Sequence, residues 1–92
     1  MPALSPAEVA AHLSALPAWQ VENGELARTF QFKDFRAALR FVNRVAGLAE
    51  EAGHHPDIDI RYNRVRLSLV THDAGGLTAK DFNLAGRTDR LD

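Results

Sequence analysis

The sequence predicts an α+β domain: a four-stranded antiparallel sheet with three helices on one face, in the order α-β-β-α-β-β-α. Short segments of alternating polar and apolar residues occur in two pairs, and each pair is joined by a connection short enough for a β-hairpin. Three other segments begin at a helix-capping residue and carry apolar residues at helical spacing. The 92 residues contain no internal repeat or linker, so we expect one domain, residues 1–92.

The first three elements are predicted from local signals. Ser5 suits the N-cap of the first helix, and Glu8, three residues later, completes a capping box. Two strands are expected next, at about 19–22 and 25–32. They are joined by Asn-Gly at 23–24, which is the strongest short signal for a hairpin.

The longest helix is expected at about 35–52, between the N-cap Asp34 and Gly53, which suits the position after the last turn. Its apolar residues form two adjacent stripes, the first with Phe35, Ala38, Leu39, Val42, Ala46 and Ala49, the second with Phe41, Val45, Leu48 and Ala52. A single sheet needs a narrower apolar face than this. We therefore expect a homodimer or homotetramer through helix 35–52 and a sheet edge, with the second stripe as the candidate contact.

The remaining elements follow the same logic. Strands are expected at 57–62 and 65–71, joined at Asn63-Arg64, and Tyr62 is expected to serve packing. Thr78 then caps a last helix, with Asp81 at the capping-box position.

Composition excludes several classes of function. There is no cysteine, which removes disulfides, zinc–thiolate sites and thiol nucleophiles. The net charge of −1 gives no bulk field for nucleic acid or an anionic membrane, so no direct nucleic-acid or membrane partner is expected. The start, MPALSPAEVAAHL, lacks the basic and apolar regions of a signal peptide, so a cytoplasmic location is expected.

Three of the four histidines lie at ends of predicted elements. His54 and His55 follow the helix-ending Gly53, and His72 closes the fourth strand, whereas His12 is expected on the surface of the first helix. Imidazole suits proton transfer near neutral pH. A polar turn is the alternative, and a metal site is a further one. Adjacent side chains on an extended segment point to opposite sides, however, so we expect no metal.

A longer pattern connects these histidines with two acidic residues. It comprises Glu50, His54-His55-Pro56, Tyr62, His72 and Asp81. This spacing, with the stretches FKDFRAALRFVNRVA and VRLSLVTHDAGGLTAKDFNLA, resembles the pterin-4a-carbinolamine dehydratase family over nearly the whole chain.

The resemblance implies a lyase that removes water from 4a-hydroxytetrahydrobiopterin to give quinonoid dihydropterin, in support of aromatic amino acid hydroxylases. It implies a small-molecule pterin substrate and no cofactor. His54, His55 and His72 are the implied catalytic residues, with His54 and His72 in acid–base roles and His55 also binding substrate. Further implied residues are Gly53, Thr71 and Asp73 for substrate binding and Glu50 and Asp81 for support. The alternative is a non-catalytic assembly protein or transcriptional coactivator on the same fold.

Overall fold

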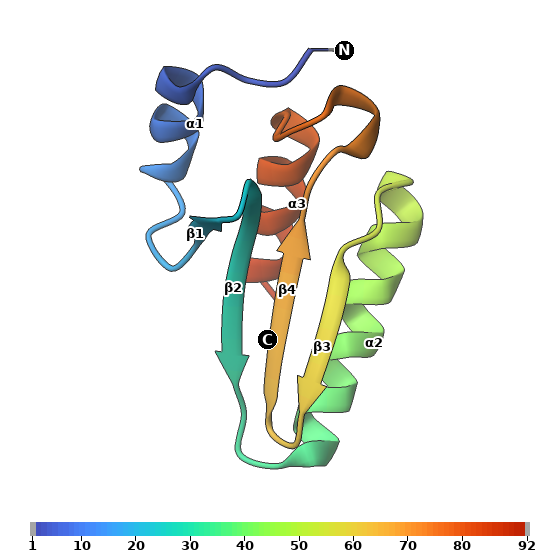
Figure 1. Cartoon of the computed structure of the whole chain (residues 1–92). Coiled ribbons are helices and arrows are strands. Elements are labelled where there is room, and N and C mark those ends of the chain that lie inside the picture. The colour runs from blue at the N-terminus through green and yellow to red at the C-terminus, as the bar shows by residue number, and fades with distance from the viewer. Residues whose placement is uncertain (1, 92) are drawn as a thin grey trace.

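The computed structural model describes residues 2–91, and its four strands form one antiparallel sheet (Figure 1). The sheet has the order β1-β2-β4-β3, with bounds β1 (Gln20–Glu22), β2 (Glu25–Gln31), β3 (Asp57–Arg61) and β4 (Arg64–Leu69). Strands β2 and β4 come from different hairpins, so their pairing joins the two hairpins in the middle of the sheet. The expected antiparallel sheet is confirmed.

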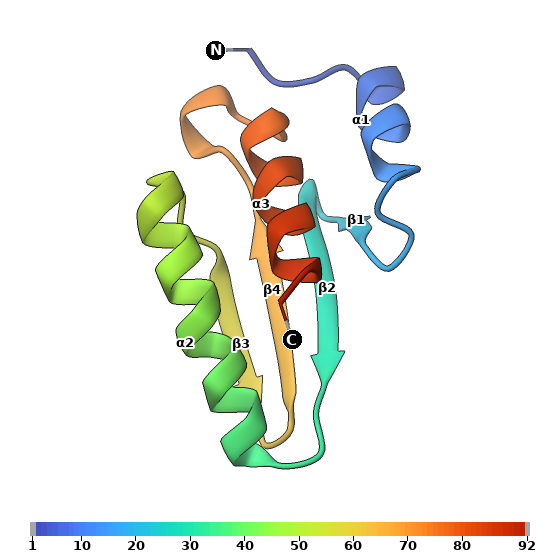
Figure 2. The ribbon, with the colours of Figure 1, turned by 180° about the vertical axis from the view of Figure 1, so that it is seen from behind.

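Three helices accompany the sheet: α1 (Pro6–Leu13), α2 (Phe35–Ala52) and α3 (Ala79–Asp89). Helices α2 and α3 lie against one face of the sheet (Figure 2). Helix α1 packs beside α3, where the His12 ring stacks on Phe82 with 5.0 Å between ring centroids. The order of elements is the predicted one, so the α+β fold class is confirmed. No helix within residues 2–91 is both long enough and apolar enough to span a bilayer.

Each helix begins at the capping residue that the sequence predicts. Ser5 and Glu8 form a reciprocal capping box at α1. The backbone N–H of Ser5 donates to the Glu8 carboxylate and lowers its pKa. Asp34 caps α2, and Thr78 with Asp81 forms a second capping box at α3. These caps depend only on residues within four positions of each other, which is why they could be predicted.

The sequence located one hairpin turn correctly and the other with an error of one residue. Asn23 and Gly24 take positive φ values of 52° and 80°, as a two-residue type I′ turn requires. The second turn lies at Tyr62-Asn63 and not at the predicted Asn63-Arg64, since Arg64 pairs with Arg61 in the sheet.

Contacts outside the hairpin explain the position of this second turn. The side-chain amide of Asn63 donates to the Phe32 carbonyl at 2.7 Å, and the Phe32 N–H donates to the Asn63 carbonyl at 2.8 Å. Asn63 is thus held in the turn by the end of the other hairpin. Tyr62 is 66% exposed, so its expected packing role is wrong.

The core lies between the sheet and helices α2 and α3. Strands β2 and β4 contribute Leu26, Phe30, Val65, Leu67 and Leu69, and the helices contribute Phe41, Val45, Phe82, Leu84 and Ala85. Phe41 and Val45 are only 3% and 0% exposed, so the stripe expected to contact another subunit belongs to the protomer's own core. That prediction is wrong. The other stripe stays partly or fully exposed at Phe35, Leu39, Val42 and Ala46, and the second stripe does so only at its end, at Leu48 and Ala52.

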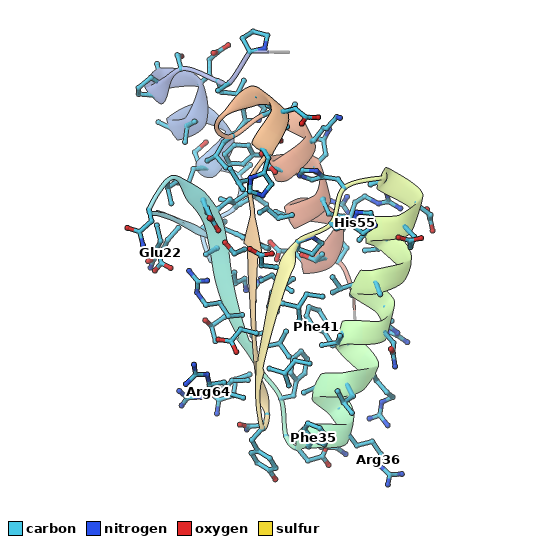
Figure 3. The ribbon with its side chains drawn as sticks, turned by 45° about the vertical axis from the view of Figure 1, so that its right-hand side comes forward. Glu22, Phe35, Arg36, Phe41, His55 and Arg64 are labelled. Carbon is cyan, nitrogen blue, oxygen red and sulfur yellow. The ribbon has the colours of Figure 1, made fainter. Side chains whose placement is uncertain are left out.

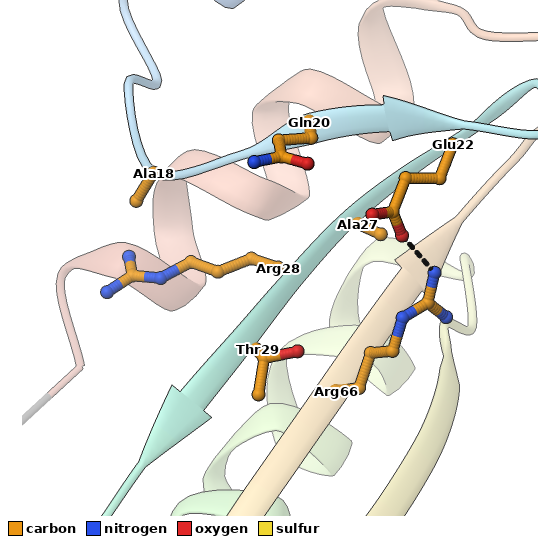
Figure 4. A pocket seen from close by; sticks show the side chains of 7 residues that line it. All are labelled: Ala18, Gln20, Glu22, Ala27, Arg28, Thr29 and Arg66. Carbon is orange, nitrogen blue, oxygen red and sulfur yellow. Dashed lines mark hydrogen bonds and ion pairs between the residues drawn. The ribbon is translucent and has the colours of Figure 1, made fainter.

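The other face of the sheet is polar. By register its side chains are Gln20, Glu22, Glu25, Ala27, Thr29, Gln31, Asp57, Asp59, Arg61, Arg64, Arg66 and Ser68. An ion pair of 2.6 Å joins Arg66 to Glu22 across this face (Figure 4). The hollow beside it has a volume of about 330 Å³, and no histidine is among its lining residues.

Candidate active site

The three histidines of the predicted site meet in one cleft. The turn after α2, the end of β4 with the 3₁₀ turn η1 (His72–Ala74), and the start of α3 lie at the same end of the molecule (Figure 1). The cleft between them has a volume of about 300 Å³ and is lined by Gly53, His54, His55, Val70, Thr71, His72, Asp73 and Lys80. The structure thus brings together segments that are far apart in the sequence.

The first wall of the cleft begins where α2 ends. Gly53 takes a left-handed conformation, with φ 61° and ψ 32°, and ends the helix as predicted. The chain then leaves the helix with His54 and His55 (His55 is labelled in Figure 3). Because the two residues are adjacent, their side chains diverge and reach different carboxylates.

His54 is bonded to a fully buried carboxylate. Its Nε2 lies 2.5 Å from Oδ1 of Asp81, which is 0% exposed, while the His54 side chain is 12% exposed. The second oxygen of Asp81 accepts the Thr71 hydroxyl and the Thr78 backbone N–H, each at 2.9 Å. Asp81 therefore caps α3 and holds a cleft histidine at the same time.

His55 has a different environment. Its Nε2 lies 2.5 Å from Oε2 of Glu50, and both side chains are largely exposed, at 63% and 77%. A pair this exposed contributes little to stability, but it orients the His55 ring. Within residues 2–91, no three His, Asp or Glu side chains are grouped as ligands for one ion.

The second wall is a short closed loop that carries His72. The backbone N–H of Thr71 donates to the Gly76 carbonyl at 3.1 Å, and the Gly75 N–H donates to the His72 carbonyl at 3.0 Å. Gly75 takes φ 71°, which favours glycine at this position. The His72 residue is exposed at the rim of the cleft. The loop thus fixes the backbone of His72 and leaves its ring accessible.

The structure places the predicted site residues in two groups. The cleft is lined by the three histidines together with Gly53, Thr71 and Asp73. Glu50 and Asp81 are not among the lining residues, and each forms a hydrogen bond with one histidine, Glu50 with His55 and Asp81 with His54. Thr71 is buried, and its hydroxyl is engaged by its neighbours.

Sequence reasoning treated Thr78 only as a helix cap and did not place Lys80 in the site. The available signal was the capping box at 78–81, because it starts α3 directly after the loop that carries His72.

Fold and cleft together define a small α+β protein in which three imidazoles share one cleft and two of them are paired with carboxylates. The chain belongs to the pterin 4 alpha carbinolamine dehydratase family, whose model matches residues 2–91. A proposed pterin-4-alpha-carbinolamine dehydratase of Chloroflexus aurantiacus is 63% identical over 91 residues, covering 99% of this chain and 98% of its own. A similarly named protein of Acidobacterium capsulatum is 59% identical, with 99% of both chains covered.

Two solved structures share the fold. A transcriptional coactivator/pterin dehydratase from Brucella melitensis superposes with a TM-score of 0.91 at 36% identity, covering 95% of both chains. A pterin dehydratase-like RuBisCO assembly factor of the alpha-carboxysome gives a TM-score of 0.63 at 26% identity, covering 77% of this chain and 82% of its own. Proteins with this fold are thus described as having different roles.

Proposed function

We propose that this protein is a lyase that removes water from 4a-hydroxytetrahydrobiopterin and releases quinonoid dihydropterin, in support of pterin recycling for aromatic amino acid hydroxylases. The observation that carries the proposal is the cleft in which His54, His55 and His72 converge, two of them with carboxylate partners. Family membership supports the same reaction. The cytoplasmic location expected from the sequence remains a prediction.

The chemistry requires two proton transfers. The C4a–O bond breaks as the 4a-hydroxyl accepts a proton and departs as water. The N5–H proton is removed, and its electron pair forms the C4a=N5 double bond. Imidazoles can supply both the acid and the base because their ordinary pKa lies near the working pH. We propose His54 and His72 for these transfers.

The remaining cleft residues are proposed to bind and orient the pterin. His55, Gly53 and Asp73 border the cleft, so ring heteroatoms of a bound pterin would find backbone and side-chain polar groups there. Glu50 supports His55 through its 2.5 Å contact with Nε2. None of these roles requires a metal ion or an organic cofactor.

A direct dehydration assay tests the proposed activity. The 4a-hydroxypterin, generated by a hydroxylase, should dehydrate faster in the presence of the purified protein than in buffer, and dialysis against a strong chelator should leave the rate intact. An unchanged rate with the protein would contradict the function. Loss of activity on chelation, with recovery on adding one metal, would contradict the metal-free mechanism.

The division of work among the histidines is tested by kinetics. His54→Ala and His72→Ala should each lower kcat, because an acid–base group typically contributes about 10²–10⁴-fold. The double variant should approach the uncatalysed rate. His55→Ala should raise KM more than it lowers kcat.

His12→Ala provides the matched control, since His12 lies outside the cleft lining. This variant should keep the wild-type rate. A double variant of His54 and His72 with near-normal kcat would rule out proton transfer by this pair.

The second candidate function is assembly or transcriptional coactivation on the same fold. It is favoured by the described roles of the Brucella melitensis and carboxysome proteins. Inactivity in the dehydration assay together with an intact fold would favour this alternative.

A further inference from the structure

Five residues form one hydrogen-bonded chain behind the cleft. The backbone N–H of Lys80 donates to Oγ1 of Thr78 at 3.3 Å, and Oγ1 of Thr78 lies 2.8 Å from Oγ1 of Thr71. The Thr71 hydroxyl then donates to Oδ2 of Asp81 at 2.9 Å. Oδ1 of the same carboxylate lies 2.5 Å from Nε2 of His54. The chain therefore runs from the first turn of α3 to an imidazole of the opposite wall.

Counting protons fixes the direction of every bond in this chain. A threonine hydroxyl has one proton, and that of Thr71 is donated to Asp81. The contact between Thr71 and Thr78 must therefore be donated by Thr78. The Thr78 oxygen remains an acceptor for the Lys80 N–H. Both hydroxyls are buried, at 8% and 1% residue exposure, so water cannot easily reverse this order.

The end of the chain determines which nitrogen of His54 carries the proton. Two donors already point at Oδ2 of Asp81, from Thr71 and from the Thr78 backbone. Imidazole is ordinarily more basic than a carboxylate, so the proton shared between Asp81 and His54 lies on Nε2. In a neutral imidazole with a protonated Nε2, Nδ1 is the only acceptor.

We propose that Thr71 and Thr78 are positioning residues that keep Asp81 an acceptor, so that His54 donates through Nε2 and exchanges protons with the pterin through Nδ1. The inference rests on the proposed dehydration, but it specifies the atom that acts. It also assigns Thr71 a role different from the substrate binding that the resemblance implies. A positioning role and a binding role predict different kinetic changes.

The tautomer of His54 is directly measurable. In protein labelled with ¹⁵N-histidine, two-bond ¹H–¹⁵N correlation at a pH where His54 is neutral should show Nε2 protonated and Nδ1 bare. Asp81→Asn should reverse this: the amide oxygen must face the Thr71 and Thr78 donors, so its NH₂ group faces His54 and donates to Nε2. A wild-type His54 with Nδ1 protonated, or a tautomer unchanged in Asp81→Asn, would overturn the proposal.

Kinetics test the two threonines. Thr71→Val keeps the shape but removes the hydroxyl, and kcat should fall roughly 10- to 100-fold, as expected for loss of a hydrogen bond to a charged group. KM should stay close to the wild-type value. Thr71→Ser retains the hydroxyl and should restore most of the rate. A rise in KM with unchanged kcat would instead assign Thr71 to substrate binding and overturn its positioning role.

Thr88→Val is the matched control for loss of stability. Thr88 is 1% exposed on α3, and its hydroxyl donates to the Ala85 carbonyl rather than to the Asp81 chain. This variant makes the same chemical change at a buried threonine, and its kcat and His54 tautomer should match the wild type. A kcat loss equal to that of Thr71→Val would mean that general loosening explains both, and would overturn the proposal.

The NMR measurement separates this inference from the proposed function. Suppose that the protein is inactive toward the pterin but still shows the Nε2–H tautomer, reversed in Asp81→Asn. The proposed function is then contradicted, and the positioning network is retained. Suppose instead that the protein is active, and that Thr71→Val changes neither the His54 signals nor kcat nor the pH profile. The proposed function then stands, and the positioning network is contradicted.

Discussion

Asp89 accepts hydrogen bonds from two distant parts of the chain. The Trp19 indole N–H and the Arg28 guanidinium reach the same oxygen, Oδ1, at 2.9 and 2.6 Å. The Arg28 guanidinium also lies 4.0 Å from the centre of the Phe30 ring. Arg28 can therefore lie on the apolar, helix-covered face of β2, because Asp89 pairs with its charge and the Phe30 ring packs against its guanidinium.

Removing this carboxylate should destabilise the protein. Asp89→Ala leaves two partly buried donors without a partner, so the free energy of unfolding should fall by about 1–3 kcal/mol. Asp89→Asn keeps an acceptor for Trp19 and should cost less. Asp59→Ala is the control, because its 3.5 Å pair with Arg61 is exposed and such pairs contribute about 0–1 kcal/mol. Urea unfolding that shows equal losses for Asp89→Ala and Asp59→Ala would refute the prediction.

The loop that carries His72 is supported by the segment that precedes α1. The Leu4 N–H donates to the Leu77 carbonyl at 2.8 Å. A Cβ on Gly76 would lie 3.0 Å from the Cβ of Ala3, which is closer than side-chain carbons normally approach. A side chain at position 76 would therefore push the two segments apart by a few tenths of an ångström.

Gly76→Ala should destabilise the protein by about 1 kcal/mol, the lower end of the cost of overpacking, because Ala3 is exposed and can yield. The double variant with Ala3→Gly removes the conflicting methyl group and should recover most of the loss. Gly47→Ala is the control: its Cβ meets nothing within 4 Å on an exposed part of α2, so it should stabilise the protein by about 0.5–1 kcal/mol. Denaturant midpoints of the four proteins measure this. Equal stability of Gly76→Ala with and without Ala3→Gly would show that the contact is not limiting.

The elements that the sequence predicted correctly are those set by neighbouring residues. Capping boxes, the Asn23-Gly24 turn and the left-handed Gly53 need only local chemistry. The turn at Tyr62-Asn63 was misplaced because Asn63 is held by Phe32 across 31 positions of the chain.

The predicted site shows the same limit. Its histidines were proposed from their places at the ends of elements and from the family resemblance, and the structure places them in one cleft. The bond from His54 to Asp81 spans 27 positions. From the sequence, Asp81 could be assigned to capping of the last helix, to support of the histidine site, or to both, and nothing in the sequence decided between these roles.

At the scale of the whole molecule, α2 keeps an apolar row that the protomer's own core covers only in part. This row consists of Phe35, Leu39, Val42 and Ala46. Its members are spaced by four, three and four residues, which is the spacing of the apolar residues along which two helices pack. Phe35 is 46% exposed. The homodimer or homotetramer that we propose would use this row, together with the exposed edge strand β3.

Val42→Glu should therefore give a folded protein of lower mass in sedimentation, because a charge cannot be buried unpaired in the seam. Val45→Glu should unfold the protomer instead, since Val45 is 0% exposed. Arg40→Gln, on the exposed side of α2 away from the row, changes the net charge equally and should keep the wild-type mass. A wild-type monomer at high micromolar concentration would exclude the assembly.

The carboxylate of Asp81 belongs both to the first turn of α3 and to the imidazole of His54. Helix ends open locally at a lower free energy than the whole molecule unfolds. Each time the first turn of α3 frays, His54 loses the acceptor for its Nε2 proton. For the dehydration proposed above, loss of activity on mild heating should therefore report the opening of this helix end, and it should begin while the sheet and core are still intact.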